Sequence, residues 1–258
     1  MFRYLTAGES HGKCLITIIE GIPAGLSLCE EDINIELKRR QIGYGRGLRM
    51  EIEKDRVEIT AGLRWGKTLG SPIALRIENL DWKNWEEKMA ISSIYENKCT
   101  PVTMPRPGHA DLAGVLKYNQ KDIRNILERA SARETAARVT AGAVAKILLK
   151  EFGIGIYSFV ISIGGIKAQI YNKNFKDLAK RAEESELRCP DPDAEKKMKE
   201  KIDKVRSQGD SLGGIFQIIA TGVPVGLGSH VHWDRKLDGR IARAIMSIQA
   251  IKAVEIGI

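Results

Sequence analysis

The sequence has few cysteines, no long apolar run and no signal peptide. Its four cysteines, Cys14, Cys29, Cys99 and Cys189, are widely spaced and form no C-x-x-C pair. This spacing favours neither a disulfide framework nor a metal ribbon, so we expect reduced thiols and no metal site. No apolar run is long enough to cross a membrane, and the first residues lack the charged and then apolar regions of a secretory signal. We therefore expect a cytoplasmic protein that does not bind membranes.

Aromatic residues are also scarce, at 6%, whereas 41 Lys and Arg outnumber 33 Asp and Glu and give a net charge of +8. A basic balance favours anionic partners, which include nucleic acids and small phosphorylated molecules. The low aromatic content weakens the case for nucleic acid, because single-strand binders need stacking platforms. The length of 258 residues and the 43% hydrophobic composition are ordinary for a soluble protein with a full core.

Basic residues gather around one helix start in the middle of the chain. Arg129 precedes the tetrad 131–134, Ser-Ala-Arg-Glu, which contains Arg133 and has the form of a capping box. A helix N-terminus carries a partial positive charge, and two arginines beside it make an attractor for a phosphate or a carboxylate. The helix that follows, 136–149, is rich in alanine, and we expect Gly142 at its middle to let a neighbouring backbone approach closely. We interpret it as a core helix.

Two histidines lie on glycine-bounded loops. His11 follows Ser10 on a loop between Gly8 and Gly12 that joins two predicted strands, and His109 follows a Pro-Gly turn. A single loop histidine is more often solvated than catalytic. The tight glycines and the hydroxyl beside His11 favour a functional role for that residue.

A loop of alternating glycine and arginine follows the first predicted helix. Positions 41–49 read Gln-Ile-Gly-Tyr-Gly-Arg-Gly-Leu-Arg and carry Arg46 and Arg49. A mobile loop of this kind can close cations over an anion. It resembles G-x-G-x-x-G only loosely and lacks the surrounding strand–helix unit, so we discard a dinucleotide-binding fold. The run at 62–68 is one residue too short for a P-loop, and we expect a plain hairpin connection.

Hydrophobic periodicity predicts strands and helices along the chain. Strands are predicted at 2–6, 14–19, 50–59, 71–77, 154–163 and 215–222, and helices at 30–40, 136–149, 175–186 and 193–205. The run Gly-Asp-Ser-Leu-Gly-Gly at 209–214 is interpreted as a turn between a helix and a strand rather than as a protease motif. His230 and His232 are too few ligands for a zinc site, so we interpret them as exposed. No repeat or linker divides the chain, and we expect a single domain over 1–258.

Four motifs in the same order resemble the chorismate synthase family. They are Gly8-Glu-Ser-His11-Gly12, Arg39-Arg40-Gln-x-Gly-Tyr-Gly-Arg46, Arg106-Pro-Gly-His109-Ala-Asp111 and Arg129-Ala-Ser131-Ala-Arg133-Glu-Thr. Each motif is short, but the four together, over the whole chain, make chance agreement negligible. The resemblance implies an α+β fold, a β-α-β sandwich with helices packed between antiparallel sheets, assembled as a homotetramer.

The resemblance also implies a lyase of the shikimate pathway. In the family, 5-enolpyruvylshikimate 3-phosphate becomes chorismate and phosphate by a 1,4-elimination that also removes a proton from C6. The reaction needs reduced FMN, which is not consumed. NADPH enters only as a possible reductant, and an external flavin reductase is a possible partner. A trianionic substrate accounts for the density of arginines noted above.

The resemblance assigns roles to individual residues. His11 protonates the departing phosphate and His109 protonates or hydrogen-bonds the flavin ring, which suits groups that titrate near neutrality. Reduced flavin is electron-rich, and the protein's part is to hold it against the substrate in a dry, cationic pocket. The substrate-binding positions are Ser10, Arg40, Arg46, Arg49, Arg106 and Arg133, and the flavin positions are His109, Arg129, Ala130, Ser131, Gln249 and Ala250. Ala130 stands where a serine is usual, which removes one possible phosphate hydrogen bond worth about 1 kcal/mol.

One departure from the family concerns the C-terminal side. Family members continue past the position of Ile258 through a long segment that supplies more flavin contacts, a substrate arginine and an aspartate that assists deprotonation. We expect the chain to lack this segment, so an inactive truncated remnant is one alternative to an active lyase. A basic nucleic-acid-binding protein is another, but its arginines would lie along a groove among aromatics rather than at glycine-bounded loops and a helix start.

Overall fold

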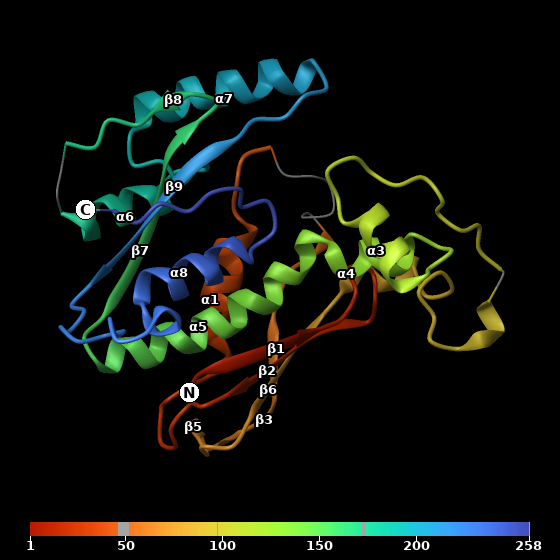
Figure 1. Cartoon of the computed structure of the whole chain (residues 1–258), viewed down its shortest axis with the longest axis horizontal. Helices are drawn as coiled ribbons and strands as arrows, with labels where there is room; N and C mark the ends of the chain where they lie inside the picture. The colour runs from red at the N-terminus through yellow and green to blue at the C-terminus, as the bar shows by residue number, and fades with distance from the viewer. Residues whose placement is uncertain (46–51, 97, 172–173, 258) are drawn as a thin grey trace. The chain divides into compact units, whose positions relative to one another are not determined.

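The computed structural model describes residues 1–45, 52–96, 98–171 and 174–257 (Figure 1). These residues form two compact units. The first unit comprises Met1–Leu37, Ile52–Val144 and Pro224–Ile258, and the second comprises Lys38–Glu51 and Ala145–Val223. The single domain expected over 1–258 stays a prediction.

The first unit is built on a four-stranded antiparallel sheet in the order β1-β2-β6-β3. Leu15, Thr17 and Ile19 of β2 are buried and alternate with exposed neighbours, because successive side chains of a strand point to opposite faces. The core continues on β6, where Ile77 lies opposite Leu15 and Ile73 lies opposite Ile19. The strands are β1 (Arg3–Ala7), β2 (Cys14–Glu20), β3 (Val57–Ala61) and β6 (Ile73–Glu78).

Two helices contribute to the core of this unit. The part of α1 (Glu30–Gln41) that belongs to it buries Ile33 and Leu37. The first turns of α5 (Thr135–Glu151) lie directly on β2. There the Thr17 hydroxyl donates to the backbone oxygen of Ala137 at 3.1 Å, and the Thr140 hydroxyl donates to the Thr17 hydroxyl at 3.0 Å. The expected core helix is confirmed.

The predicted close approach at Gly142 is wrong. Gly142 is exposed, and a Cβ at this position would meet no atom within 4 Å. Buried alanines, among them Ala137 and Ala141, make the close contact instead. Small side chains, rather than a missing one, therefore bring α5 onto the sheet.

The strand predicted at 50–59 is shorter than expected and begins at Val57. The described residues before it carry two buried carboxylates that point inward to polar partners. Glu53 accepts a hydrogen bond from the backbone N–H of Leu80 at 3.0 Å, and Asp55 accepts one from Arg133 Nη1 at 2.6 Å. These contacts replace strand pairing there. A small hairpin follows, as predicted, with β4 (Leu63–Arg64) paired to β5 (Lys67–Thr68).

The sequence pattern missed three helices of the first unit, α3 (Asp111–Tyr118), α4 (Arg124–Ala130) and α8 (Leu237–Met246). Short 3-10 turns connect the elements, namely η1 (Leu80–Asn84), η2 (Ser93–Tyr95), η3 (Ala132–Glu134) and η4 (Trp233–Arg235). The helices α3 and α4 touch at Gly114, where an added Cβ would lie 2.3 Å from Cγ2 of Ile126. This close crossing joins the element after His109 to the element that carries Arg129.

The second unit contains an antiparallel sheet in the order β8-β7-β9 and two helices. Phe159 of β7 packs against Leu178 and Ala182 of α6 in its core. Asp191 caps α7 by accepting from the backbone N–H groups of residues 193 and 194. The elements are β7 (Gly155–Ile163), β8 (Ile166–Lys167), α6 (Phe175–Glu184), α7 (Pro192–Ser207) and β9 (Gly214–Thr221).

Helices and antiparallel sheets in both units confirm the predicted α+β class. Residues 209–213 of the run lie between α7 and β9, as expected for a turn, and Gly214 begins the strand. His230 and His232 are exposed, and His232 Nδ1 lies 2.9 Å from Asp234 Oδ1. Among the described residues, no helix has the length and apolar character needed to cross a membrane.

Candidate active site

The loop between β1 and β2 is shaped by one glycine and one buried asparagine. Gly8 has φ of +107°, and a Cβ there would lie 2.4 Å from the backbone oxygen of Cys14, so only glycine fits. The side chain of Asn79, which is 2% exposed, donates to the backbone oxygen of Gly12 at 2.7 Å. The two contacts fold the loop tightly and hold His11 in one place.

His11 is bound on three sides. Its Nδ1 lies 2.8 Å from Oε1 and 3.0 Å from Oε2 of Glu128, a buried residue of α4. The backbone N–H of His11 donates to Oε2 of the same carboxylate at 2.7 Å. The ring stacks on Trp85 with centroids 4.0 Å apart, and Nε2 lies 3.8 Å from Asp81 Oδ2. The imidazole keeps 19% of its surface exposed, so it is positioned yet accessible.

His109 forms a second cluster with a buried carboxylate. Asp111, at the first turn of α3, has no exposed surface and pairs through Oδ1 with His109 Nδ1. Its Oδ2 accepts from the backbone N–H and from Nε of Arg106, at 3.0 and 3.1 Å. Burial raises the pKa of Asp111, but the hydrogen bonds from Arg106 and His109 outweigh it and bring the pKa to about 2. The side chain of Arg106 remains 55% exposed.

Ser10, Arg129 and Ser131 are brought together where α4 ends. The Ser131 hydroxyl donates to the Ser10 hydroxyl at 3.2 Å. Arg129 donates from Nη2 to the backbone oxygen of Thr6 at 2.8 Å and from Nη1 to that of Gly8 at 3.3 Å. The guanidinium thus holds strand β1 and its loop, while 41% of the side chain stays exposed.

Arg133 faces the interior rather than solvent, in contrast to the anion attractor expected there. Its side chain is 5% exposed, and Nη1 donates to Asp55 Oδ1 at 2.6 Å while Nη2 lies 3.5 Å from Glu53 Oε2. Nε donates to Asn79 Oδ1 at 2.9 Å. Two carboxylates therefore balance this cation. Its role in substrate binding stays a prediction.

The expected capping box at 131–134 is half present. The Ser131 hydroxyl accepts from the backbone N–H of Arg133 at 3.3 Å. The Glu134 carboxylate does not reach back to the cap but accepts from Thr6, Arg138 and Gln249. The capped element is η3, and α5 begins at Thr135. Tertiary partners thus took the carboxylate that the local pattern assigned to the helix end.

Glu134 holds Gln249, a predicted flavin residue near the C-terminal end of the chain. Gln249 Nε2 donates to Glu134 Oε2 at 2.9 Å, and Arg138 donates to both Glu134 and Ser247. Burial raises the pKa of Glu134, but the hydrogen bonds from Gln249, Thr6 and Arg138 outweigh it and lower the pKa. Gln249 Oε1 is buried and has no hydrogen-bond partner among the described residues.

The structure describes the other predicted site residues only in part. Arg40 is partly buried at the end of α1 and belongs to the second unit. Arg46 and Arg49 lie outside the described residues. Ala130 is the last residue of α4, and Ala250 follows Gln249 with φ of +66°.

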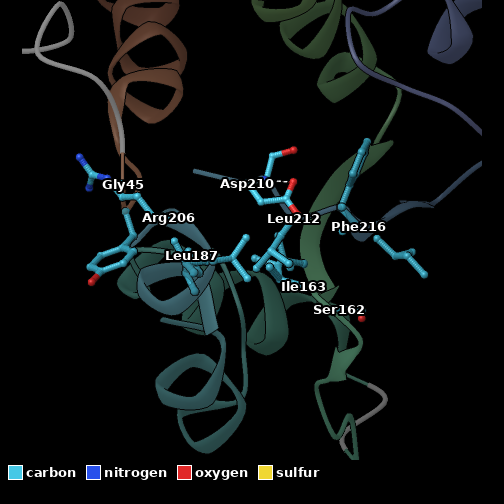
Figure 2. Close-up of a pocket in the computed structure, with 16 residues that line it drawn as sticks. Gly45, Ser162, Ile163, Leu187, Arg206, Asp210, Leu212 and Phe216 are labelled. Carbon is cyan, nitrogen blue, oxygen red and sulfur yellow. Dashed lines mark hydrogen bonds between the residues drawn. The ribbon is translucent and has the colours of Figure 1, made fainter. Parts of the chain in front are cut away.

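The second unit contains a cavity of about 550 Å³ (Figure 2). Residues of β7, of α7 and of the segment 210–216 line it, together with Tyr44 and Gly45. Figure 2 shows Gly45 at one side. Tyr44 is fixed there by its hydroxyl, which donates to Asp203 at 2.7 Å. The cavity lining is mostly apolar, and no predicted site residue that the structure describes belongs to it.

Sequence reasoning missed the groups that hold the two histidines. Glu128 lies one residue before the motif that begins at Arg129. No local feature of the sequence indicates its tertiary role. Trp85 and Asp81 lie in a segment for which the sequence predicts neither a helix nor a strand nor a role. Asp111 ends one of the four motifs, but the resemblance assigns it no role. A carboxylate two residues after a histidine on a Pro-Gly turn was the available signal, because so short a separation allows direct contact.

Fold and site together define a basic α+β protein whose two loop histidines are each held by a buried carboxylate. The chorismate synthase family model matches residues 2–258. A chorismate synthase of Aquifex aeolicus is 61% identical over 264 residues and one of Geotalea uraniireducens is 60% identical over 258 residues, covering 99% and 100% of this chain. The chain belongs to the chorismate synthase family, and the resemblance seen in its four motifs is confirmed.

A solved structure agrees with this assignment. The crystal structure of a chorismate synthase matches the chain with a TM-score of 0.82 and 53% sequence identity, over 99% of this chain and 68% of that one. The chain spans 66% of the length of each of the two curated relatives.

Proposed function

We propose that the chain acts in a lyase reaction that converts 5-enolpyruvylshikimate 3-phosphate to chorismate and phosphate. Family membership supports this proposal, and so does one contact in the structure. The Ser131 hydroxyl donates to the Ser10 hydroxyl at 3.2 Å. It joins the loop of His11, expected to act on the substrate, to the segment expected to hold the flavin.

Exposed cations beside the clusters suit an anionic substrate. The side chains of Arg106 and Arg129 are 55% and 41% exposed, so both can contact a bound anion. His11 would donate a proton to the phosphate oxygen as the carbon–oxygen bond breaks, since its ring is positioned and accessible. The other change in the 1,4-elimination is the loss of the C6 proton.

The residues present fit a flavin. Gln249 Oε1 is a buried acceptor without a partner among the described residues, and an N–H of an isoalloxazine ring would satisfy it. The bond to Glu134 fixes which end of the Gln249 amide is the oxygen, because a carboxylate accepts only from the NH₂ group. When bound, reduced FMN supplies electron density to the reacting ring of the substrate. Arg129 and His109 are the groups expected to contact it.

The remaining expectations are also proposals. A homotetramer, an external flavin reductase and NADPH as reductant are consistent with the family but rest on the resemblance. Family membership favours the lyase over a basic nucleic-acid-binding protein. A salt titration of binding to random DNA tests that alternative, because a phosphate-neutralising binder loses affinity steeply with salt.

An anaerobic assay tests the proposed reaction. The chain is incubated with the substrate and chemically reduced FMN. It is tested once alone and once fused to the part of the Aquifex aeolicus relative that it does not span, a fusion called the combined protein below. We expect the combined protein to form chorismate and phosphate in equal amounts without net oxidation of the flavin. Phosphate without chorismate, or no product from the combined protein, contradicts the proposal.

A further inference from the structure

The Glu128 carboxylate binds both the backbone and the ring of His11. Oε2 accepts from the backbone N–H at 2.7 Å, and Nδ1 of the ring lies 2.8 Å from Oε1. The backbone oxygen of Glu128 accepts a hydrogen bond from the backbone N–H of Ser10 at 3.0 Å. Glu128 is 2% exposed, so no water competes freely for these bonds.

These contacts determine which ring nitrogen of His11 is protonated in the neutral imidazole. An ionised carboxylate has acceptors only, so a nitrogen 2.8 Å from Oε1 must donate to it. Nδ1 of His11 is therefore protonated in both the neutral and the charged imidazole. Only Nε2 is left to gain or lose a proton.

The other groups around His11 leave Nε2 available. The nearest acid beside Glu128 is Asp81, whose Oδ2 lies 3.8 Å from Nε2, beyond hydrogen-bond distance. Asp81 is itself held by Trp85 Nε1 at 3.2 Å and by Asn84 Nδ2 at 2.8 Å. Among the described cations, Lys88 Nζ lies 5.0 Å from the centroid of the Trp85 ring, on which His11 stacks.

We propose that Glu128 is a positioning residue that fixes the proton of His11 on Nδ1 and makes Nε2 the atom that exchanges a proton with the substrate. The catalytic part of this inference rests on the proposed function. The structural part does not, because it concerns the free protein. Glu128 acts through His11 and need not touch the substrate.

An amide at this position gives a sharp test. In Glu128→Gln, the backbone N–H of His11 still requires an acceptor, so the amide oxygen must turn toward it. The amide NH₂ then faces Nδ1, which can only accept. The proton of the neutral ring must move to Nε2. The variant therefore reverses the tautomer while it keeps the size of the side chain.

The measurement is a two-bond ¹H–¹⁵N spectrum of protein with ¹⁵N-labelled histidine, recorded over a pH series without substrate or flavin. The chain has four histidines, so single substitutions assign them. We expect Nδ1 of His11 to stay protonated at all pH values while Nε2 titrates, and the roles to reverse in Glu128→Gln. The matched control is Glu58→Gln, which removes an exposed ion pair with Arg76 and should leave the spectrum of His11 unchanged.

The outcomes separate this inference from the proposed function. An unprotonated Nδ1 in the neutral His11 ring of the wild-type chain overturns the inference about Glu128, even if the variant fails to fold. An unchanged tautomer of His11 in a folded Glu128→Gln overturns it as well. In the combined protein used for the anaerobic assay, we expect Glu128→Gln to lower turnover by about 10²–10⁴-fold with little change in KM, as for other histidines held in the wrong tautomer. Normal turnover despite a reversed tautomer also overturns it. Failure of the wild-type assay alone concerns only the proposed reaction.

Discussion

The imidazole of His109 is paired through Nδ1 with the carboxylate of Asp111, a side chain without exposed surface. The same carboxylate accepts two hydrogen bonds from Arg106. A single buried carboxylate thus orients an imidazole and a guanidinium that both remain partly exposed. His11 has the corresponding partner in Glu128. Buried carboxylates therefore define the orientation of both histidines.

The pair of Asp111 predicts a defined acid sensitivity. Its pKa is lowered from 3.8 to about 2, because the hydrogen bonds from Arg106 and His109 outweigh the effect of burial. A carboxyl whose pKa is lower when folded contributes stability that is complete above its unfolded pKa and is lost as the pH falls through the folded value. We expect the stability difference between wild type and Asp111→Asn to shrink from about pH 4 to about pH 2. Urea unfolding at a series of pH values measures it, and a difference that is constant over this window contradicts the assignment.

Two glycines are expected to respond oppositely to alanine. Gly8→Ala places a Cβ 2.4 Å from the backbone oxygen of Cys14 at a positive φ, so we expect a loss of about 2–4 kcal/mol. Gly142→Ala adds a methyl group in open space within a helix and should stabilise by about 0.5–1 kcal/mol. Urea denaturation of both variants provides the comparison. Equal effects would show that local geometry does not decide these positions.

Arg133 is predicted to matter for stability as well as for any substrate contact. Arg133→Ala removes a buried cation that pairs with the buried carboxylates of Asp55 and Glu53, which should cost about 3–5 kcal/mol. Arg76→Ala serves as the comparison because both side chains of its ion pair with Glu58 are exposed, at 41% and 58%. If Arg133→Ala keeps wild-type stability and changes only the affinity for the substrate, the structural role given to this arginine is wrong.

Flavin binding is predicted to depend on redox state. Arg129 and His109 should favour the anionic reduced ring over the neutral oxidised one, because a cationic site stabilises the charged form. Anaerobic titration with reduced and oxidised FMN measures both affinities. Equal affinities, or tighter binding of the oxidised form with substrate present, count against this site.

Local patterns in the sequence predicted the regular elements better than the site. The alternation in β2 and the alanines of α5 report burial directly, so both elements were found. The partner of His11 lies 117 residues away in the chain, and such a pairing leaves no local trace. Helix α8 was missed because Gly239 and Arg240 interrupt its apolar pattern. Tertiary hydrogen bonds also overrode the capping box at Glu134.

The most direct test of the proposed chemistry is the turnover of His11→Ala in the anaerobic chorismate assay, with the combined protein as the active reference. We expect turnover to fall by about 10²–10⁴-fold, the range for removing a positioned general acid. The variant loses the stacking on Trp85 and one partner of the buried Glu128, so its stability is measured beside turnover, and the folded variant should still bind reduced FMN. Near-normal turnover of His11→Ala across the pH range would contradict the role of this histidine and the proposed site with it.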